Sequence, residues 1–362
     1  MSASPPLDWA AIKRLLLRRQ PLQQLDFSGQ DLSGRSFAGA LLQECRLQGS
    51  RLAGCDLAGT TLLDCDLSGA DLSAASLAAT NLVRCRLVEA TLPAAPLVQC
   101  VFSACDLSRV LWDGAQVQLC VFNECILSGA RLRRSRWHRS AAVAARLEGA
   151  DLSGSHFDQA ALNDTDLSTA VLAGIGARTS LFMNARLGGQ DLGGLSLSRC
   201  NFDGADFRGA RLDGADFSEC LCRNARFAGT AMAGLRANNA LFLGATLEEV
   251  NLRDAQLEGA VFQEARLRNV HLEGARLARS VWDKSCHEGV SFAGADLTFA
   301  RFNHARGGHV DLGRSVLDYC RLHDVQFSPV SYRGAKRRKA LDTDAALLAA
   351  EARTLHLEQA LP

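Results

Sequence analysis

Residues 47–73 read LQGSRLAGCDLAGTTLLDCDLSGADLS, with leucine at every fifth position from Leu47 to Leu72. The same phase extends from Leu22 to Tyr332, and 51 of these 63 positions are Leu or Phe. A five-residue period matches neither an α-helix, which repeats about every 3.6 residues, nor a flat strand, which alternates every second residue. The chain therefore repeats one structural unit every five residues.

The composition of each pentad suggests one edge of a polygon. The residue two before each Leu or Phe is small, as at Cys55 and Ala70, and the residue between them is usually polar, as at Asp71. Three alternating residues suit a short extended segment with the small residue and the Leu or Phe facing inward. The next two positions are rich in Gly, as at Gly54, which is the composition of a turn.

Residues 70–74 (ADLSA), 150–154 (ADLSG) and 205–209 (ADFRG) resemble the A(D/N)LXX unit of pentapeptide-repeat proteins. The resemblance implies an all-β fold, a right-handed quadrilateral parallel β-helix in which four pentads close one coil. Every fourth pentad then stacks on the one before it at about 4.8 Å, the spacing of adjacent strands. Residues 22–335 would form one repeat domain of about 15 to 16 coils and about 75 Å at that spacing.

Short helical caps are expected at both ends, because a solenoid leaves its end coils open to pairing. Residues 1–21 are expected to hold a capping helix, with Asp8 as N-cap and Trp9, Ile12 and Leu16 on one face. Residues 336–362 form a basic linker and a second helix over about 342–360. In that helix we place a stripe with heptad spacing, at Leu341, Leu348 and Leu355.

The C-terminal stripe has two interpretations. It could fold back on the last coil, or it could dock a partner or a second copy of the chain. In the quinolone-resistance members of the family a C-terminal segment makes the dimer, so the resemblance favours a homodimer.

Composition narrows the classes of function. Lys plus Arg (40) nearly cancels Asp plus Glu (39), which disfavours nucleic-acid binding. No segment is apolar enough for a membrane span or a signal peptide, so we expect a cytoplasmic protein.

Eleven of the 13 cysteines occupy the small inward position. We interpret them as reduced, packed thiols, with a metal or redox stack as the alternative.

Stacking of every fourth pentad sorts the outward positions into four faces. One face alternates Asp and Arg from Asp26, Arg46 and Asp66 onward, which indicates a charge-neutral solvated surface. Some pentapeptide-repeat proteins resemble B-form DNA in shape and negative charge and bind DNA gyrase or topoisomerase IV, which protects against quinolones or toxins. Such mimicry needs a continuous acidic face, and the alternation disfavours it.

A second face carries a contiguous apolar column. Ten of its 15 outward positions are apolar, and a strip of this kind usually marks an interaction surface. The alternative is that a terminal helix covers part of it. We predict a partner-binding face at Leu41, Val101, Val121, Leu181, Leu221, Leu241, Val261 and Val281.

The repeat is irregular at two further places. His287 occupies a Leu/Phe slot four pentads before Gly307, with Cys286, His304 and His309 nearby; we favour volume compensation over a metal site, and assign no metal ligand. Near Trp137 there is a basic patch that could contact phosphate or an acidic protein, or could simply be solvated: Arg131, Arg133, Arg134, Arg136 and Arg139.

The motifs of enzymes are absent: the chain has no P-loop, no HExxH and no nucleophile elbow. We therefore predict no catalytic residue and no cofactor. The leading hypothesis is a non-enzymatic scaffold, a rigid bacterial rod that docks a protein partner through its apolar face. The resemblance also implies a narrower version, an accessory or loading factor of a type VI secretion system. The alternative is the DNA mimic that binds gyrase or topoisomerase IV.

Overall fold

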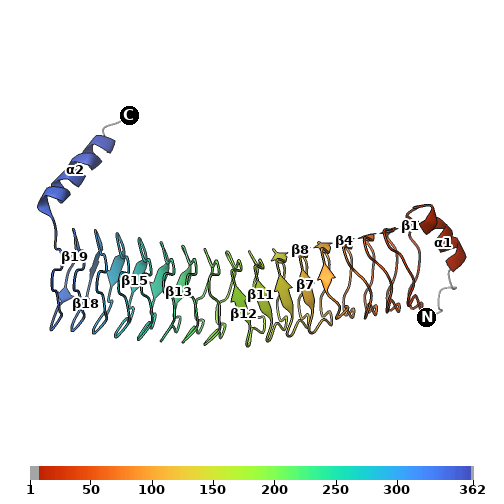
Figure 1. Ribbon diagram of the computed structural model, residues 1–362, viewed down its shortest axis with the longest axis horizontal. Coiled ribbons are helices and arrows are strands. Elements are labelled where there is room, and N and C mark those ends of the chain that lie inside the picture. The colour runs from red at the N-terminus through yellow and green to blue at the C-terminus, as the bar shows by residue number, and fades with distance from the viewer. Residues whose placement is uncertain (1–7, 360–362) are drawn as a thin grey trace. The chain divides into compact units, whose positions relative to one another are not determined.

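The computed structural model describes residues 8–359, and the side chains of residues 8–353. The chain divides into two compact units, one ending at Leu187 and the other beginning at Gly188. In both units short strands stack in parallel from coil to coil, so that Leu42 pairs with Leu62 and Leu247 with Leu267 (Figure 1). The fold is a parallel β-helix, as the five-residue period and the resemblance predicted.

From residue 8 onward, the first unit contains one helix and twelve strands. The strands form two ladders of hydrogen-bonded neighbours, β1-β2-β3-β4-β6-β8-β10 and β12-β11-β9-β7-β5. Other coil edges pair through single bridges such as Asp26 with Arg46. The elements are α1 (Trp9–Leu17), β1 (Leu22–Gln23), β2 (Leu41–Gln43), β3 (Thr61–Leu63), β4 (Asn81–Val83), β5 (Leu97–Val98), β6 (Val101–Ser103), β7 (Gln116–Gln118), β8 (Val121–Asn123), β9 (Arg136–His138), β10 (Ala141–Val143), β11 (His156–Asp158) and β12 (Gly176–Arg178).

Up to residue 359, the second unit has eight strands and one helix, and the strands form the ladders β13-β14-β15-β16-β17-β19 and β18-β20. Neither helix in the described part of the chain could cross a bilayer, since both are too short or too polar. The elements are β13 (Arg226–Ala228), β14 (Thr246–Glu248), β15 (Arg266–Arg268), β16 (Cys286–Glu288), β17 (Arg306–Gly308), β18 (Val310–Asp311), β19 (Gln326–Phe327), β20 (Val330–Ser331) and α2 (Ala345–Gln359).

Most corners of the coils change the direction of the chain at a residue with positive φ. The carbonyl of Leu52 accepts the N–H of Cys55 at 3.0 Å, and Gly54 between them has a φ of 69°. Glu44, at the equivalent position, has a φ of 52°. Gly adopts this conformation without steric cost, which explains why it is common there. The ladder of inter-coil hydrogen bonds holds other residue types in the same conformation.

The Leu/Phe column fills the interior of both units. In the second unit the rings of Phe242, Phe262 and Trp282 stack on successive coils, with centroid separations of 4.7 and 4.2 Å and nearly parallel planes. Phe102 and Phe122 stack in the same way at 4.7 Å in the first unit. These aromatic side chains are fully buried and therefore belong to the core.

The cysteines of the inward column are buried and unbridged. The thiol of Cys55 lies 2.8 Å from the carbonyl oxygen of Leu32, and that of Cys320 lies 2.9 Å from that of Leu297. Burial raises the pKa of Cys320 to about 12, so this thiol stays protonated at neutral pH. Cys286 differs, since it is the exposed member of the thirteen.

Helix α1 lies against the first coil. The Asp8 carboxylate accepts the N–H of Ala10 at 2.9 Å, and Ile12 is buried. Trp9 contacts the edge of Phe37 with a centroid separation of 5.4 Å, and the Arg35 guanidinium lies 4.6 Å from the Trp9 ring. The helix thus covers an open coil edge.

The solenoid continues past residue 335, which we predicted from the sequence to be its last residue. Lys336 still bridges to Val316, and Leu341 bridges to Arg321. Helix α2 begins only at Ala345, after Asp344, whose carboxylate accepts the N–H groups of Ala346 and Leu347 as an N-cap. Leu341 therefore belongs to the last coil, and its placement in a helical stripe with Leu348 and Leu355 is wrong. The side chain of Leu355 lies outside the described residues.

Candidate interaction surface

The apolar column predicted from the sequence lies on one face of each unit. In the first unit, parallel pairing places Leu41 beside Thr61 and, three coils further, Val101 beside Val121. Val101, Val121 and Leu181 are 37%, 38% and 40% exposed, whereas Leu41 is half-buried. Thr61, Asn81, Ala141 and Ala161 lie between these residues, so large apolar side chains are interspersed with small and polar ones in this unit.

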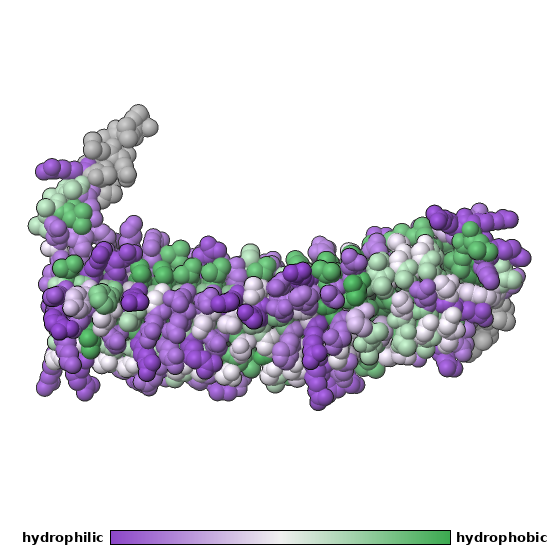
Figure 2. All heavy atoms as spheres, viewed as in Figure 1, coloured by the Kyte–Doolittle hydropathy of each residue, from purple (hydrophilic) through white to green (hydrophobic). Residues whose placement is uncertain are grey.

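In the second unit the large apolar residues are consecutive. Leu221, Leu241, Val261 and Val281 occupy four successive coils, and each bridges to the next. All four are half-buried, and Leu243 extends the strip sideways along its own coil. We call these five residues the apolar strip. Figure 2 shows hydrophobic residues gathered along the corresponding edge of the second unit.

The apolar strip lies directly outside the aromatic stack. Leu241, Val261 and Val281 each immediately precede an inward Phe or Trp of the stack. Beyond the strip, the same column continues with Arg301, Arg321 and then Leu341, which is 60% exposed. The strip therefore ends at a basic pair before the C-terminal helix.

The face that alternates Asp and Arg from Asp26 onward, which we call the acid–base column, brings opposite charges next to one another, as the sequence indicated. Asp26 bridges to Arg46, and Arg46 to Asp66, so opposite charges alternate from coil to coil. Arg46 lies 3.8 Å from Asp26, and Arg186 pairs with Asp166. Burial raises the pKa of Asp166, but hydrogen bonds from Ser168 and the pairing with Arg186 outweigh burial and leave the pKa below its usual value.

The basic patch is partly neutralised by carboxylates. Arg131 and Arg133 both pair with Asp113, at 2.5 and 2.9 Å, and Arg133 also lies 3.6 Å from Asp151. Arg139 donates to the side chain of Gln159 at 2.9 Å, while Arg134 and Arg136 are exposed.

The tryptophan beside that patch is not available to a ligand. Trp137 is only 3% exposed, and its indole N–H donates to Ser135 inside the coil. The ring packs against Phe122 at 5.3 Å, next to the small Ala142. Ala142 in turn pairs with Phe122 from the adjacent coil, so Trp137 is a core side chain beside a large and a small neighbour.

The residues around His287 do not form one site. His287 is buried in the core, whereas Cys286 and His309 are exposed. Gly307, on the next coil, has a φ of 149°, and a Cβ there would lie 1.7 Å from the His287 carbonyl oxygen. Only glycine fits beside the His287 backbone, so we interpret the pair as a local packing solution.

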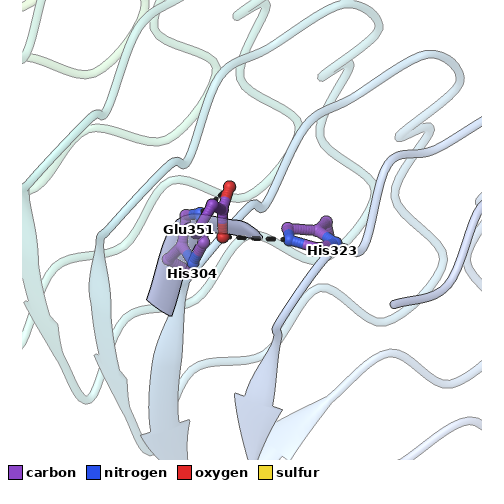
Figure 3. A group of neighbouring side chains, drawn as sticks. All are labelled: His304, His323 and Glu351. Atoms are coloured by element: carbon purple, nitrogen blue, oxygen red, sulfur yellow. Dashed lines mark hydrogen bonds and ion pairs between the residues drawn. The ribbon is translucent and has the colours of Figure 1, made fainter. Parts of the chain in front are cut away.

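Sequence reasoning missed one group of polar residues. His304, His323 and Glu351 lie together where α2 meets the last coils (Figure 3). The separation of the two histidines in the sequence, which is close to one coil, could have indicated that they are neighbours. The sequence has no comparable signal for Glu351, because its position depends on the direction of α2.

Three features together define a class of protein. Each pentad forms one edge of a coil, the Leu/Phe column points inward, and the turn residues adopt the left-handed conformation. The pentapeptide-repeats family model matches the chain in eight copies, within 22–59, 36–73, 65–103, 100–136, 143–174, 180–219 and 240–279. These residues make up more than half of the chain. The chain belongs to the pentapeptide-repeat family.

Two solved structures illustrate what the chain is similar to. HetL, a pentapeptide-repeat protein involved in heterocyst differentiation regulation in Nostoc sp. strain PCC 7120, is 24% identical over 72% of this chain and 94% of its own, with a TM-score of 0.23. Full-length QnrB1, a plasmid-mediated fluoroquinolone resistance protein, is 18% identical over 68% and 98%, with a TM-score of 0.27. No curated protein matches the chain. Likeness at this level carries no argument about function.

Proposed function

We propose that this protein is a non-enzymatic scaffold that docks a protein partner on the apolar strip. The observation that carries the proposal is the run of Leu221, Leu241, Val261 and Val281 on four consecutive coils, bridged in register. The other faces of these coils carry charged or polar outward residues, such as Arg226, Gln256 and Asn251. A contiguous apolar surface bordered by polar residues is typical of an interaction site.

The spacing of the strip suits an amphipathic helix of the partner. Four coils place side chains from Leu221 to Val281 over about 14 Å, at about 4.8 Å per coil. A helix rises about 5.4 Å per turn, so residues at i, i+3, i+7 and i+10 span about 15 Å and can meet the four coils in turn. The neighbouring charges are already matched within the chain, since Arg223 pairs with Asp203 at 2.6 Å. Such a partner would be recognised through apolar contact more than through charge.

Two features support a role without catalysis. The interior is filled by the Leu/Phe column, with side chains such as Leu257 and Phe262 completely buried. An open depression of about 640 Å³ over Asn238, Glu258 and Phe299 is shallow surface relief, lined by scattered polar side chains and the Phe299 ring. Catalysis usually requires a cleft with converging polar groups.

Substitution on the strip tests the proposal. Leu241→Asp combined with Val261→Asp places two carboxylates in the strip and should abolish partner capture, because their desolvation opposes apolar contact. The measurement is quantitative co-purification of the full chain from the cells that make it. Gln256→Asp is the matched control, since it adds a carboxylate to the same coils on another face, between Arg236 and Arg276.

The test compares which proteins co-purify with the double variant and with the control, whatever the yield of each preparation. If the double variant keeps its circular dichroism spectrum and captures the same proteins as the control, the strip is not the docking surface. Leu181→Asp extends the comparison to the apolar column of the first unit, where Val101 and Val121 are also exposed.

The narrower version of this proposal is an accessory or loading role beside a type VI secretion system, in a bacterial cytoplasm. It rests on the family resemblance, and the buried, unbridged thiols are consistent with a reducing compartment. Identification of a secreted effector or a spike component among strip-dependent partners would support it. Dimerisation through α2 stays a prediction, tested by the mass of the purified protein in solution by light scattering.

A further inference from the structure

One polar cluster joins helix α2 to the last coils of the second unit. It consists of His304, His323 and Glu351, which we call the His–Glu cluster (Figure 3). The nitrogen Nε2 of His323 lies 3.3 Å from one carboxylate oxygen of Glu351, and Nε2 of His304 lies 3.6 Å from the other. One ligand atom from each residue lies within 4.8 Å of the others. His323 is buried, whereas His304 and Glu351 are half-buried.

The fold brings these residues together from three segments. His304 and His323 are on adjacent coils, where the N–H of His304 donates to the carbonyl of His323 at 2.9 Å. Glu351 lies in the second turn of α2. The start of α2 is held near the coil by two further hydrogen bonds, from the N–H of Asp324 to the Thr343 hydroxyl at 3.1 Å and from the N–H of Asp344 to Nδ1 of His323 at 3.2 Å.

Helix α2 has little apolar attachment to the solenoid. Of its side chains from Ala345 to Arg353, Leu348 and Glu351 are half-buried and the others are exposed. Leu347 is 48% exposed. An isolated helix of this length is marginal in water unless tertiary contacts stabilise it. A strong polar cross-link at the His–Glu cluster would supply the attachment that burial does not.

Two imidazoles and a carboxylate are the ligands that Zn²⁺ prefers. In a tetrahedral site with bonds of about 2.0–2.1 Å, ligand atoms lie roughly 3.3 Å apart. The separations of 3.3 and 3.6 Å join the two histidines to different oxygens of Glu351. One ligand atom from each residue lies within 4.8 Å of the others, so the three side chains have to move closer together to surround an ion. We propose that the His–Glu cluster binds one Zn²⁺ ion, which fastens α2 to the terminal coils.

The surroundings of His304 suit a metal ligand. Its nitrogen Nδ1 lies 3.2 Å from a carboxylate oxygen of Asp324. A carboxylate that accepts the second ring N–H of a ligating histidine fixes its tautomer and makes Nε2 a better donor to the metal. Asp324 is itself oriented by the side-chain amide of Gln326 at 3.2 Å.

His323 must change tautomer when the ion binds. Because its Nδ1 accepts the N–H of Asp344, the neutral ring carries its proton on Nε2, which donates to Glu351. Coordination through Nε2 moves that proton to Nδ1 and breaks the bond with Asp344. The ion thus replaces one hydrogen bond at the start of α2 with a bond to Glu351 in its second turn.

The test uses the full chain with the exposed Cys286 replaced by Ser, so that the remaining thiols are buried. After treatment with a chelator, Zn²⁺ is titrated in competition with a chromophoric chelator. We expect one ion per chain, and at least about tenfold weaker binding in His323→Ala and Glu351→Gln. His309→Ala is the matched control, because this exposed histidine lies on the same coil region outside the cluster.

A second readout follows the helix directly. Zn²⁺ should slow tryptic cleavage at the exposed Arg353 in the parent protein and not in Glu351→Gln, which sits on α2 and leaves the solenoid core untouched. Equal binding by the parent and by both cluster variants would overturn the proposal, as would absence of stoichiometric Zn²⁺ binding by the folded parent. Binding of Mg²⁺ with similar affinity would also contradict it, because Mg²⁺ prefers oxygen ligands.

Discussion

At the scale of single residues, His287 is the clearest departure from the repeat. Its Nε2 lies 2.7 Å from the Ser285 hydroxyl, which itself donates to the carbonyl of Trp282, so Nε2 carries the proton. The other nitrogen, Nδ1, is buried and has no hydrogen-bond partner in the structure. The ring packs among aromatic side chains, including Phe327 at 5.2 Å. Burial of this kind disfavours the charged imidazole and lowers its pKa to about 3.

This burial predicts loss of stability in mild acid. In the unfolded chain His287 binds a proton near pH 6.5, whereas in the folded chain it does so only near pH 3. Between these values the unfolded state binds more protons, so the free energy of unfolding falls as the pH is lowered, by up to about 1.4 kcal/mol per pH unit from this group. His287→Leu should remove that part of the slope, measured by urea unfolding between pH 6 and 4.5.

The exposed His309, replaced by Asn, controls for loss of a histidine as such. The carboxylates with lowered pKa, such as Asp166, affect the pH dependence of the free energy of unfolding at lower pH, and they are the same in both variants. At pH 7, His287→Leu should be as stable as the parent or more stable by about 1 kcal/mol, since it removes an unpartnered buried nitrogen. An unchanged slope in this variant would show that His287 is not the group responsible.

At the scale of elements, α1 covers the open edge of the first coil. The helix is joined to the coil by Ile12, by the contact of Trp9 with Phe37 and by the Arg35 guanidinium on the Trp9 ring. Its removal would leave the first strand, Leu22–Gln23, with one unpaired edge. Unpaired edges of a sheet recruit other chains.

Deletion of residues 1–20 should therefore promote association of the chain without unfolding the coils. We expect an increase in mass by light scattering that grows with concentration, with little change in the β signal of circular dichroism. Trp9→Ala is the milder comparison, and Leu17→Ala is the control, because Leu17 is 76% exposed on the same helix. A deletion variant that stays at the mass of the parent at all concentrations would contradict the role of α1 as a cap.

At the scale of the whole molecule, the distribution of charge bears on the two functional hypotheses, the scaffold and the DNA mimic. Each carboxylate of the acid–base column stands next to an arginine on an adjacent coil, as Asp66 does between Arg46 and Arg86. Exposed pairs of this type contribute little to stability, but they cancel the field of the column. A DNA mimic needs the opposite, a continuous negative potential.

We expect the purified protein to leave DNA supercoiling by gyrase unchanged at micromolar concentration. A suitable comparison is a variant in which Arg46, Arg86 and Arg186 are replaced by Glu, which makes the column more continuously acidic. Inhibition of gyrase by the parent protein at that concentration would favour DNA mimicry. It would also show that a charge-neutral column is compatible with binding to the enzyme.

Much of the fold was predictable because its information is repeated. The inward position of Leu42 and Leu62 and their pairing on adjacent coils follow from the period, and every coil supplies the same evidence. The apolar column was found with the same spacing. The exposure of its side chains could not be predicted. Val101 is exposed and Val261 is half-buried, because the exposure of each residue depends on the neighbouring side chains of adjacent coils.

The period, the coil register, the buried thiols and the neutral acid–base column can all be read from the order of the amino acids, because each is a local pattern reinforced from coil to coil. The tertiary structure alone decided where the repeat ends and α2 begins, since Leu341 pairs with Arg321 instead of joining the helix. It also decided that Glu351 meets His304 and His323. That contact depends on the direction in which the chain leaves the last coil after Asp344, and no periodic signal specifies such a direction.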